Sequence, residues 1–285
     1  MPPAPRPLPA LFAACLLACP AAAQAGAPCG PHVAALYPFA RFYFEGPQTR
    51  PGGIDQDMFD ELARRSGCRL TLVVQSRARI WEQMRRGSVQ LTLSALPSPE
   101  RLRLAELVPY AQGRYQVLMR RELAARVASL ADFEADPRLR LLDVRGYAHG
   151  PTLDAWVQRM RGQGRLVETG DFKTAERMLR AGRADGLLTL PDGWGAVTAA
   201  GDGPGGFVAL DVAPQERNAI SLALARAMPE ADRLRLRRAL QAMLADGTVY
   251  GILRRHLGDP AARAALLPPG CGGGRAGADN PAPCP

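Results

Sequence analysis

Ser98-Pro99-Glu100-Arg101 is the segment whose residue types and spacing are best suited to holding a ligand. It comes a few residues after an apolar strand pattern, in the position where an open α/β sheet places its ligands. The guanidinium of Arg101 has a planar set of N–H donors that matches a carboxylate with two parallel hydrogen bonds, and the Ser98 hydroxyl can join it. The alternative is a surface arginine at a helix start that Ser98 caps. We predict a carboxylate-binding pair.

Three further candidates lie near strand ends in the same half of the chain. Tyr37 and Phe39 follow the first apolar strand pattern, and their rings could enclose an aliphatic or cationic ligand group. The other aromatic residues between 42 and 44 are expected to be core. Ser94 lies at the end of a strand pattern and is predicted to direct a hydroxyl toward the cleft, with ordinary strand termination as the alternative.

A second group of candidates follows a later strand pattern. Tyr147 comes directly after the strand end at Val144-Arg145-Gly146, and His149 leads through Gly150 into a predicted helix. The N–H groups at a helix N-terminus bind anions readily. A tight strand-to-helix turn would explain the glycines equally well. Tyr147 and His149 are therefore candidate ligand contacts.

These candidates are positioned by two successive runs of alternating strand and helix patterns. The first run has strand patterns at 33–37, 70–74 and 89–95 and helix patterns at 58–63 and 80–84. The second has strand patterns at 139–144 and 186–190 and helix patterns at 152–160 and 171–179. An extended stretch at 218–224 and helices at 236–244 and 250–253 follow. The first run is a β-α-β-α-β unit, which implies a largely parallel sheet with right-handed crossovers. The second run restarts the alternation of strand and helix and is expected to form a second lobe.

The N-terminus predicts export. Arg6 precedes an apolar stretch over 8–18, which is too short for a bilayer, and small residues follow. Residues 1–25 are therefore predicted to be a cleaved signal peptide, and the protein is expected in the periplasm. The segment ending at Cys19 also fits a lipobox, so a lipoprotein anchored at Cys19 is the alternative.

The cysteines agree with an oxidising compartment. Four remain after cleavage, namely Cys29, Cys68, Cys271 and Cys284, and four cysteines allow three connectivities. The first two flank strand patterns that are expected to be neighbours, so we predict the pairs Cys29–Cys68 and Cys271–Cys284. The cysteines and histidines do not cluster in the spacing of a metal site, and no metal is predicted.

The net charge of +9 does not by itself indicate a nucleic-acid or membrane surface. Of the 36 basic residues only Lys173 is a lysine, so the charge comes from arginines scattered along helix faces. Aromatic residues are not interleaved with them as in a nucleic-acid interface. We therefore predict no nucleic-acid partner and a general attraction for anions.

Residues 53–110 resemble lobe one of the bacterial solute-binding proteins of family 3. The resemblance rests on Gly53-Ile54-Asp55-Gln56-Asp57 at one end and on Ser98 to Arg101 with Val108-Pro109-Tyr110 at the other. It implies an α/β, two-lobed, periplasmic-binding-protein-like fold, with a mostly parallel sheet flanked by helices in each lobe. The chain would cross between lobes twice, near 112–118 and 214–220. Lobe one would comprise 28–114 and 216–258 and lobe two 115–215, and 259–285 would be a poorly ordered tail rich in Pro, Gly and Ala.

The resemblance also implies roles for individual residues. Arg101 and Ser98 would grip the ligand's α-carboxylate, and the loop after Val144 would complete that grip. Asp55 would cap or orient a helix start. Members that bind amino acids place an Asp, which holds the α-ammonium group, at the position that Leu190 occupies here. Asp192, two residues later, is the candidate substitute, so an amino-acid ligand is not assured.

The function that the resemblance implies is capture of a small carboxylate-bearing solute by hinge closure, as a monomer without a cofactor, for an inner-membrane ABC permease. One alternative is an enzyme on the same fold, a dehydratase of cyclohexadienyl precursors of aromatic amino acids. Its acid would be Glu168, Asp192 or His149. The other alternative is a ligand-sensing subunit of a signalling system.

Overall fold

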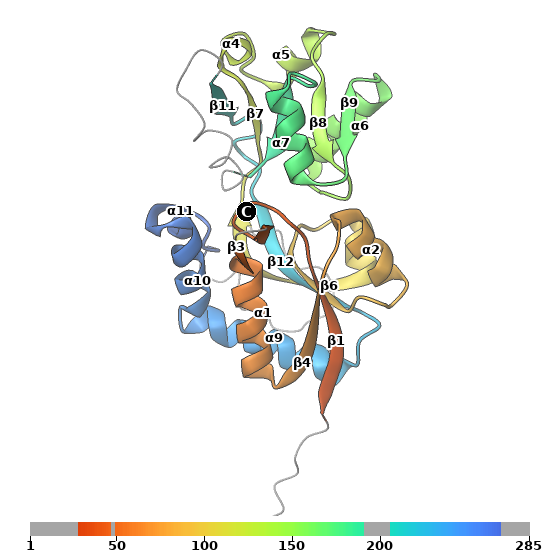
Figure 1. Ribbon diagram of the computed structural model, residues 1–285, viewed down its shortest axis with the longest axis vertical. Coiled ribbons are helices and arrows are strands. Elements are labelled where there is room, and N and C mark those ends of the chain that lie inside the picture. The colour runs from red at the N-terminus through yellow and green to blue at the C-terminus, as the bar shows by residue number, and fades with distance from the viewer. Residues whose placement is uncertain (1–27, 47–48, 191–205, 269–285) are drawn as a thin grey trace, which may run out of the picture.

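Two five-stranded sheets organise the chain, one in each of two lobes that lie above one another in Figure 1. The computed structural model describes residues 28–46, 49–190 and 206–268. The predictions for the signal peptide, Cys19, Asp192 and the pair Cys271–Cys284 lie outside these residues. Among the described residues, none of the helices has the length and apolar character that a membrane span requires.

The first lobe is built around the sheet β4-β1-β5-β12-β6. Its strands are β1 (Cys29–Leu36), β4 (Cys68–Val74), β5 (Leu91–Ala95), β6 (Ala105–Gly113) and β12 (Asn218–Ala225). The helices α1 (Ile54–Ser66), α2 (Arg77–Arg85) and α3 (Pro99–Leu104) connect the first four of these strands, and a hairpin of β2 (Phe44–Gly46) and β3 (Thr49–Gly52) precedes α1. The apolar faces of α1 and α2 bury Met58, Phe59, Ile80 and Met84 against this sheet.

The second lobe is built around the sheet β11-β7-β10-β8-β9. Its strands are β7 (Gln116–Arg120), β8 (Leu141–Val144), β9 (Leu166–Thr169), β10 (Gly186–Thr189) and β11 (Phe207–Leu210). Its helices are α4 (Arg121–Ala124), α5 (Leu130–Ala135), α6 (Pro151–Gly162) and α7 (Phe172–Arg180). Trp156 of α6 is fully buried and packs edge-on against Phe133 of α5.

Each sheet is mixed rather than mostly parallel. In the first lobe β1 pairs in parallel with β4 and β5, whereas β12 is antiparallel to β5 and β6. In the second lobe β8 is parallel to β9 and β10, whereas β7 is antiparallel to β10 and β11. The parallel half of each sheet comes from the βαβ unit. The antiparallel half comes from strands that lead into or out of the connections between the lobes.

Two short segments connect the sheets. Residues 114–115 lead from β6 to β7, and residues 211–217 lead from β11 back to β12. Arg114 in the first segment forms an ion pair of 2.8 Å with Asp211 in the second and donates a hydrogen bond of 3.0 Å to the carbonyl oxygen of Pro214. The two connections are therefore tied together beside the cleft.

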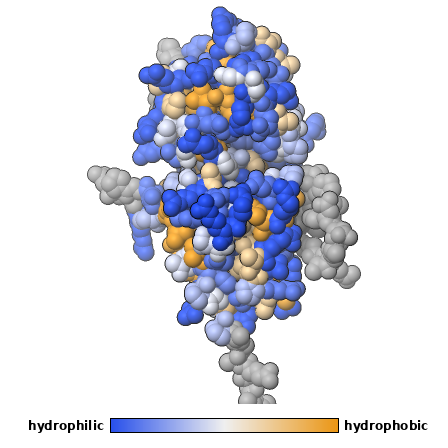
Figure 2. All heavy atoms as spheres, turned by 90° about the vertical axis from the view of Figure 1, so that its right-hand side faces the viewer, coloured by the Kyte–Doolittle hydropathy of each residue, from blue (hydrophilic) through white to orange (hydrophobic). Residues whose placement is uncertain are grey.

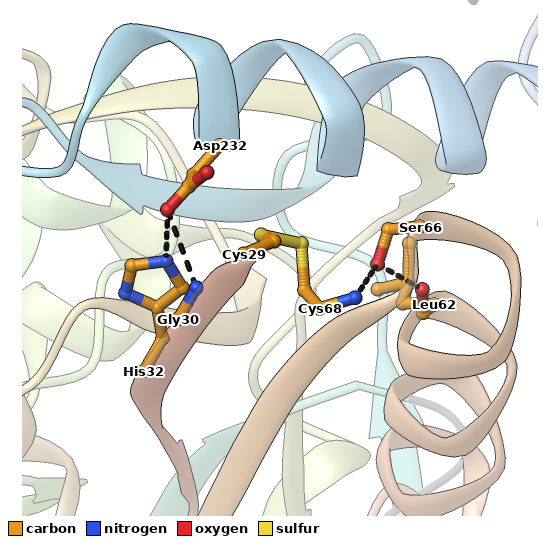
Figure 3. The surroundings of a disulfide bond; sticks show 7 residues. All are labelled: Cys29, Gly30, His32, Leu62, Ser66, Cys68 and Asp232. Carbon is orange, nitrogen blue, oxygen red and sulfur yellow. Dashed lines mark hydrogen bonds and ion pairs between the residues drawn. A yellow bond between two sulfur atoms is a disulfide. The ribbon is translucent and has the colours of Figure 1, made fainter. Parts of the chain in front are cut away.

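The predicted disulfide between Cys29 and Cys68 is present (Figure 3). These cysteines are paired residues on the neighbouring parallel strands β1 and β4, as their sequence positions predicted. Beside the disulfide, His32 Nε2 lies 2.8 Å from Asp232 Oδ2 on α9 (Glu230–Ala245), which ties the start of β1 to that helix. Cys29, His32 and Asp232 are grouped closely enough to suggest a metal site, but the disulfide uses the sulfur of Cys29.

The C-terminal helices return to the first lobe. Helix α9 contacts α1, and α10 (Thr248–Leu257) packs against both of them. The prediction that the disordered tail begins at 259 is wrong, because Asp259–Ala264 forms the helix α11. Pro260 lies in its first turn, where a missing N–H group costs nothing. Gln112 of β6 then donates to the carbonyl oxygens of Ala265 and Leu266.

Candidate functional site

Three parallel strands of the first lobe end at the same edge of their sheet, facing the second lobe. Strand β1 lies between β4 and β5, so the residues that follow all three come close together. These residues include Tyr37 after β1, Arg77 after β4, and Ser98 with Arg101 after β5. The carboxyl edge of parallel strands is where open α/β sheets bind ligands.

A cavity of about 420 Å³ lies between the lobes at this edge. The first lobe lines it with residues of α2 and α3, including Trp81, Glu82, Arg85, Ser98, Glu100 and Arg101. The second lobe lines it with the loop after β8 and with α6 and β9, including Asp143, Gly146, Tyr147, His149, Asp154 and Glu168. Helices α2 and α6 are on the right of Figure 1, so they face the viewer in Figure 2, where the surface around the waist between the lobes is mostly hydrophilic.

Arg101 lies at the centre of this cavity wall. Its guanidinium is buried, donates to the carbonyl oxygen of Leu96 at 2.9 Å, and lies 4.6 Å from the centre of the Trp81 ring. Nη2 also donates across the cleft to the carbonyl oxygen of Gly146, at 2.7 Å. Burial, together with the positive charge of Arg77, lowers the pKa of Arg101 to about 9. The group is still charged at neutral pH, in an environment that disfavours that charge.

Ser98 has the capping role that was the alternative to ligand binding. Its side chain accepts a hydrogen bond of 3.2 Å from the backbone N–H of Arg101, at the start of α3. The cap orients the first turn of the helix and thereby places the Arg101 side chain. Ser98 also lines the cavity, so one residue can position the arginine and face a ligand.

Arg77 is a second buried arginine at this edge, and the sequence analysis did not single it out. Its Nη1 donates to Thr92 Oγ1 and to the carbonyl oxygen of Leu93, both at 3.1 Å, and Nη2 donates to the carbonyl oxygen of Ser94 at 2.8 Å. Its guanidinium lies over the Tyr37 ring, 4.3 Å from the ring centre. The signal that could have found Arg77 is its position three residues after β4, at the same carboxyl edge of the sheet as Arg101.

Ser94 and Asp55 form a buried polar pair beneath these arginines. Ser94 has a left-handed backbone with φ of 54°, its Oγ donates to Asp55 Oδ1 at 2.8 Å, and its N–H donates to the Tyr110 hydroxyl at 3.2 Å. Burial raises the pKa of Asp55 to about 7, against the opposing effects of the Ser94 hydrogen bond and the charge of Arg77. Asp55 was expected to cap or orient the start of α1. It does not cap the helix, because the cap residue is Gly53 and no side chain caps that helix, but its hydrogen bond with Ser94 ties the first turn of α1 to β5.

The aromatic candidates lie where the lobes touch. Phe39 of the first lobe packs edge-on against Phe172 of the second at 4.9 Å between ring centres, and Tyr37 packs edge-on against Tyr147 at 5.7 Å. All four side chains are buried or half-buried. In this closed arrangement Tyr147 lines the cavity, whereas Tyr37 and Phe39 lie behind its wall.

His149 is buried between two carboxylates of the second lobe. Its Nδ1 lies 3.2 Å from Asp154 Oδ1, and its Nε2 lies 3.1 Å from Asp143 Oδ1 in an ion-pair contact whose angle does not make a hydrogen bond. Burial disfavours the charged ring, but the two carboxylates outweigh it and raise the pKa of His149 to about 9. The imidazolium therefore balances part of the negative charge on this wall.

Two glycines in the loop after β8 allow the second lobe to approach the first lobe closely. Gly146 has φ of 86°, and a Cβ there would lie 2.5 Å from the backbone nitrogen of Ala78 in α2. Gly150 has φ of 101°, and a Cβ there would lie 2.3 Å from Asn218 Oδ1. Asn218 also donates to the carbonyl oxygen of His149 at 2.9 Å. The loop after β8 thus contacts the first lobe through backbone atoms.

The structure brings four of the predicted ligand contacts to the cavity, namely Arg101, Ser98, Tyr147 and His149. Leu190 is buried at the end of β10, near Gly113 at the crossing between the lobes, and has no polar group to offer. Glu168 lines the cavity but pairs with Arg161 at 2.9 Å. Two further carboxylates of the second lobe that line the cavity, Asp143 and Asp154, were not predicted from the sequence.

Comparison with known proteins shows what this chain is similar to. A sequence model of the bacterial extracellular solute-binding proteins, family 3, matches residues 32–259. No curated protein sequence matches the chain at a significant level.

Many solved structures share the two-lobed fold, at identities that show the fold alone. The arginine-, lysine- and histidine-binding protein ArtJ from Geobacillus stearothermophilus has a TM-score of 0.68 and 14% identity, with 80% of this chain and 96% of that chain covered. An ancestral amino acid-binding protein, a precursor of cyclohexadienyl dehydratase, has a TM-score of 0.65 and 19% identity, with coverages of 79% and 94%. A histidine kinase sensor domain similar to periplasmic binding proteins has a TM-score of 0.67 and 16% identity, with coverages of 84% and 99%.

Proposed function

Because the chain belongs to family 3 of the bacterial extracellular solute-binding proteins, we propose that it captures a small carboxylate-bearing solute in the periplasm and delivers it to an ABC permease. The observation that carries this proposal is the state of Arg101. It is a buried guanidinium in the wall of the cleft, and no carboxylate oxygen among the described residues lies within ion-pair distance of it. An anionic ligand would supply the missing partner.

The electrostatics support an anionic ligand over a neutral one. Burying a charge without a partner is costly, and a carboxylate held by two parallel hydrogen bonds offsets that cost. Arg101 lines the cavity and uses two of its five N–H donors on the carbonyl oxygens of Leu96 and Gly146, which leaves three donors for a ligand. A ligand carboxylate would take the place of the Gly146 carbonyl as the acceptor.

Hinge closure is the motion we propose for capture. The lobes are connected by two short segments that Arg114 ties together, and elsewhere they meet through side chains and one glycine loop. Hinge motions between such lobes are a common way to enclose a small solute. The closed form would bury the ligand between α2 and α3 on one side and the loop after β8 on the other.

An α-amino group on the solute is not required by this site. Leu190 is apolar, and Asp143 and Asp154 are both engaged with His149. We therefore propose that the protein is a receptor for a carboxylate that need not carry an α-amino group. It would act as a monomer and not as a catalyst.

The experiment is a thermal-shift screen followed by calorimetric titration of the purified protein. The panel contains amino acids, amines, mono- and dicarboxylates and aromatic acids including prephenate. A ligand at 100 times its dissociation constant adds about 2.7 kcal/mol of stability, which is readily measured. Arg101→Ala is the test variant, and Arg103→Ala, an exposed arginine on the same helix, is the control.

We expect carboxylates to stabilise the wild type and the Arg103→Ala variant but not Arg101→Ala. Binding of the same carboxylate with unchanged affinity by Arg101→Ala would contradict the proposal. Steady conversion of prephenate or another panel acid by the purified protein would show that it is an enzyme.

A further inference from the structure

Arg77 and Arg101 form a pair of buried guanidiniums on the first lobe's side of the cleft. Both lie close to one aromatic ring, since their guanidinium carbons are 5.3 and 4.6 Å from the centre of Trp81. No carboxylate oxygen of the described residues lies within ion-pair distance of either group. Two like charges held close together and away from water repel each other, which favours an anion beside them.

Arg165 shows what a buried structural arginine looks like in this protein. A guanidinium has five N–H donors. All five of those in Arg165 are used, and its acceptors are the carbonyl oxygens of Phe133, Glu134, Asp136 and Leu139 and the side chain of Gln163. By contrast, Arg77 makes three hydrogen bonds with described residues and Arg101 makes two. The pair at the cleft therefore retains donors for a ligand.

The second lobe lies against the backbone at Arg77, although Arg77 is not among the described residues that line the cavity. Gly146 lies against the backbone of Arg77 and Ala78, where an added Cβ would come within 3.0 Å of the Arg77 carbonyl carbon. The Tyr37 ring under the Arg77 guanidinium contacts Tyr147 of the second lobe. Separation of the lobes would remove both of these contacts with the second lobe.

Trp81 has a buried hydrogen-bond donor in the cavity wall that a ligand acceptor would satisfy. Its side chain is only 7% exposed, it lines the cavity, and its indole Nε1–H has no hydrogen-bond partner among the described residues. A buried donor without a partner costs free energy that a ligand acceptor would recover. The donor belongs to the ring that both guanidiniums approach.

The acidic groups nearby do not neutralise the arginine pair. Asp55 faces Arg77 from α1 but is hydrogen-bonded to Ser94, and it does not reach ion-pair distance. On the second lobe, Asp143 and Asp154 both contact His149, which balances part of their charge. On the first lobe, the carboxylates Glu82 and Glu100 line the cavity but pair with Arg85.

We propose that Arg77 is a second anion-binding residue beside Arg101, and that the solute is a small dianion whose charges the two guanidiniums share. This inference rests on the proposed function, namely on anion binding by Arg101, and specifies the charge of the anion and not its acid group. The two negative charges could sit on separate carboxylates or on one doubly charged group such as a phosphonate. Trp81 Nε1 would donate to the same ligand.

The test compares matched pairs of anions by calorimetric titration of the full protein. Succinate and glutarate are compared with butyrate and valerate, which have the same chain lengths and one charge fewer. Methylphosphonate, at a pH where it is doubly charged, is compared with methanesulfonate. The variants are Arg77→Met, Arg77→Lys and Arg101→Ala, with Arg103→Ala as the control, and circular dichroism and melting curves check that each is folded.

We expect the wild type and Arg103→Ala to bind at least one dianion at least tenfold more tightly than its monoanionic match. Loss of hydrogen bonds to a charged group weakens binding roughly 10- to 100-fold, so Arg77→Met should abolish this preference while monoanion binding persists. Arg77→Lys should retain part of the preference because it keeps the charge. Which dianion is preferred identifies whether the charges are separate or on one group.

Three results would overturn the inference. The first is that the folded wild type prefers no dianion over its monoanionic match. The second is that Arg77→Met keeps the preference unchanged, and the third is that no dianion binds at all. Each leaves the proposed function standing if another carboxylate still binds in an Arg101-dependent manner. The proposed function itself fails only if carboxylates do not bind or do not depend on Arg101.

Discussion

The guanidinium of Arg101 in the first lobe donates a hydrogen bond of 2.7 Å to the carbonyl oxygen of Gly146 in the second lobe. This bond joins the proposed anion anchor directly to the glycine loop that closes over it. The Gly146 carbonyl oxygen accepts a hydrogen bond from an N–H group of Arg101 that a ligand carboxylate would also use. Ligand binding and lobe closure therefore involve the same atoms of Arg101. The predictions below start from this contact and from the buried charges around it.

Gly146→Ala should impair closure and weaken ligand binding at least tenfold. The new Cβ would lie 2.5 Å from the backbone nitrogen of Ala78, which leaves no room in the closed form. The matched control is Gly164→Ala, which has a similar φ of 69° but nothing within 4 Å of the added Cβ. Both variants bear the left-handed backbone cost of about 1 kcal/mol. Calorimetry and small-angle scattering with the ligand should distinguish them, and equal affinities would contradict the prediction.

The charge on His149 should make stability fall as the pH rises from about 6.5 to 9. The pKa of this histidine is raised to about 9 in the folded protein, so the fold holds a proton that the unfolded chain releases above its ordinary value of 6.5. The contribution is fully present below pH 6.5 and amounts to about 3 kcal/mol. Urea unfolding at several pH values should show a smaller decline in His149→Gln than in the wild type. Parallel curves for the two proteins would refute this.

The buried carboxyl of Asp55 should make stability fall in a lower pH range. Its pKa is raised to about 7, so between about pH 4 and 7 the folded protein keeps a proton that the unfolded chain has lost. Stability is therefore greatest at the acid end of this range and declines by about 4 kcal/mol toward neutrality. Asp55→Asn should remove the decline, whereas Asp60→Asn, at an exposed position of α1, should keep it. Denaturant titrations across this range provide the measurement.

Removing the disulfide should destabilise the first lobe. Cys29 and Cys68 are 39 residues apart, and closing a loop of that length is worth about 4 kcal/mol on the chain-entropy model. The double variant Cys29→Ser with Cys68→Ser should lose about this much free energy of unfolding. A reductant should produce a similar loss in the wild type and no change in the variant. An unchanged wild-type stability under reducing conditions would argue against the bond.

The fold and the family could be predicted from residues close together in the sequence. Alternating strand and helix patterns and the segment from Gly53 to Tyr110 identified the two-lobed α/β fold. The pairing of Cys29 with Cys68 followed from the expectation that two successive parallel strands lie side by side. These predictions worked because periodicity, caps and crossover rules act over short stretches of chain.

The partners of the buried charges could not be predicted in this way. The sequence did not single out Arg77. It predicted that Asp55 caps or orients a helix start and that His149 is a candidate ligand contact, without indicating the partners of either side chain. Their actual contacts join Asp55 to Ser94 and place Arg77 over Tyr37. Each of these contacts depends on the direction in which a side chain leaves its element, which residue type alone does not reveal.

The sequence by itself determined the class of the protein, its two lobes and the position of Arg101 at the carboxyl edge of a sheet. Only the tertiary structure decided that a second arginine shares this edge, that a histidine lies between two aspartates on the opposite wall, and that Gly146 closes onto Arg101. The physical reason is that burial and charge–charge distance set the electrostatics of a cleft. Both quantities arise only when segments far apart in the chain, from two lobes, are brought together.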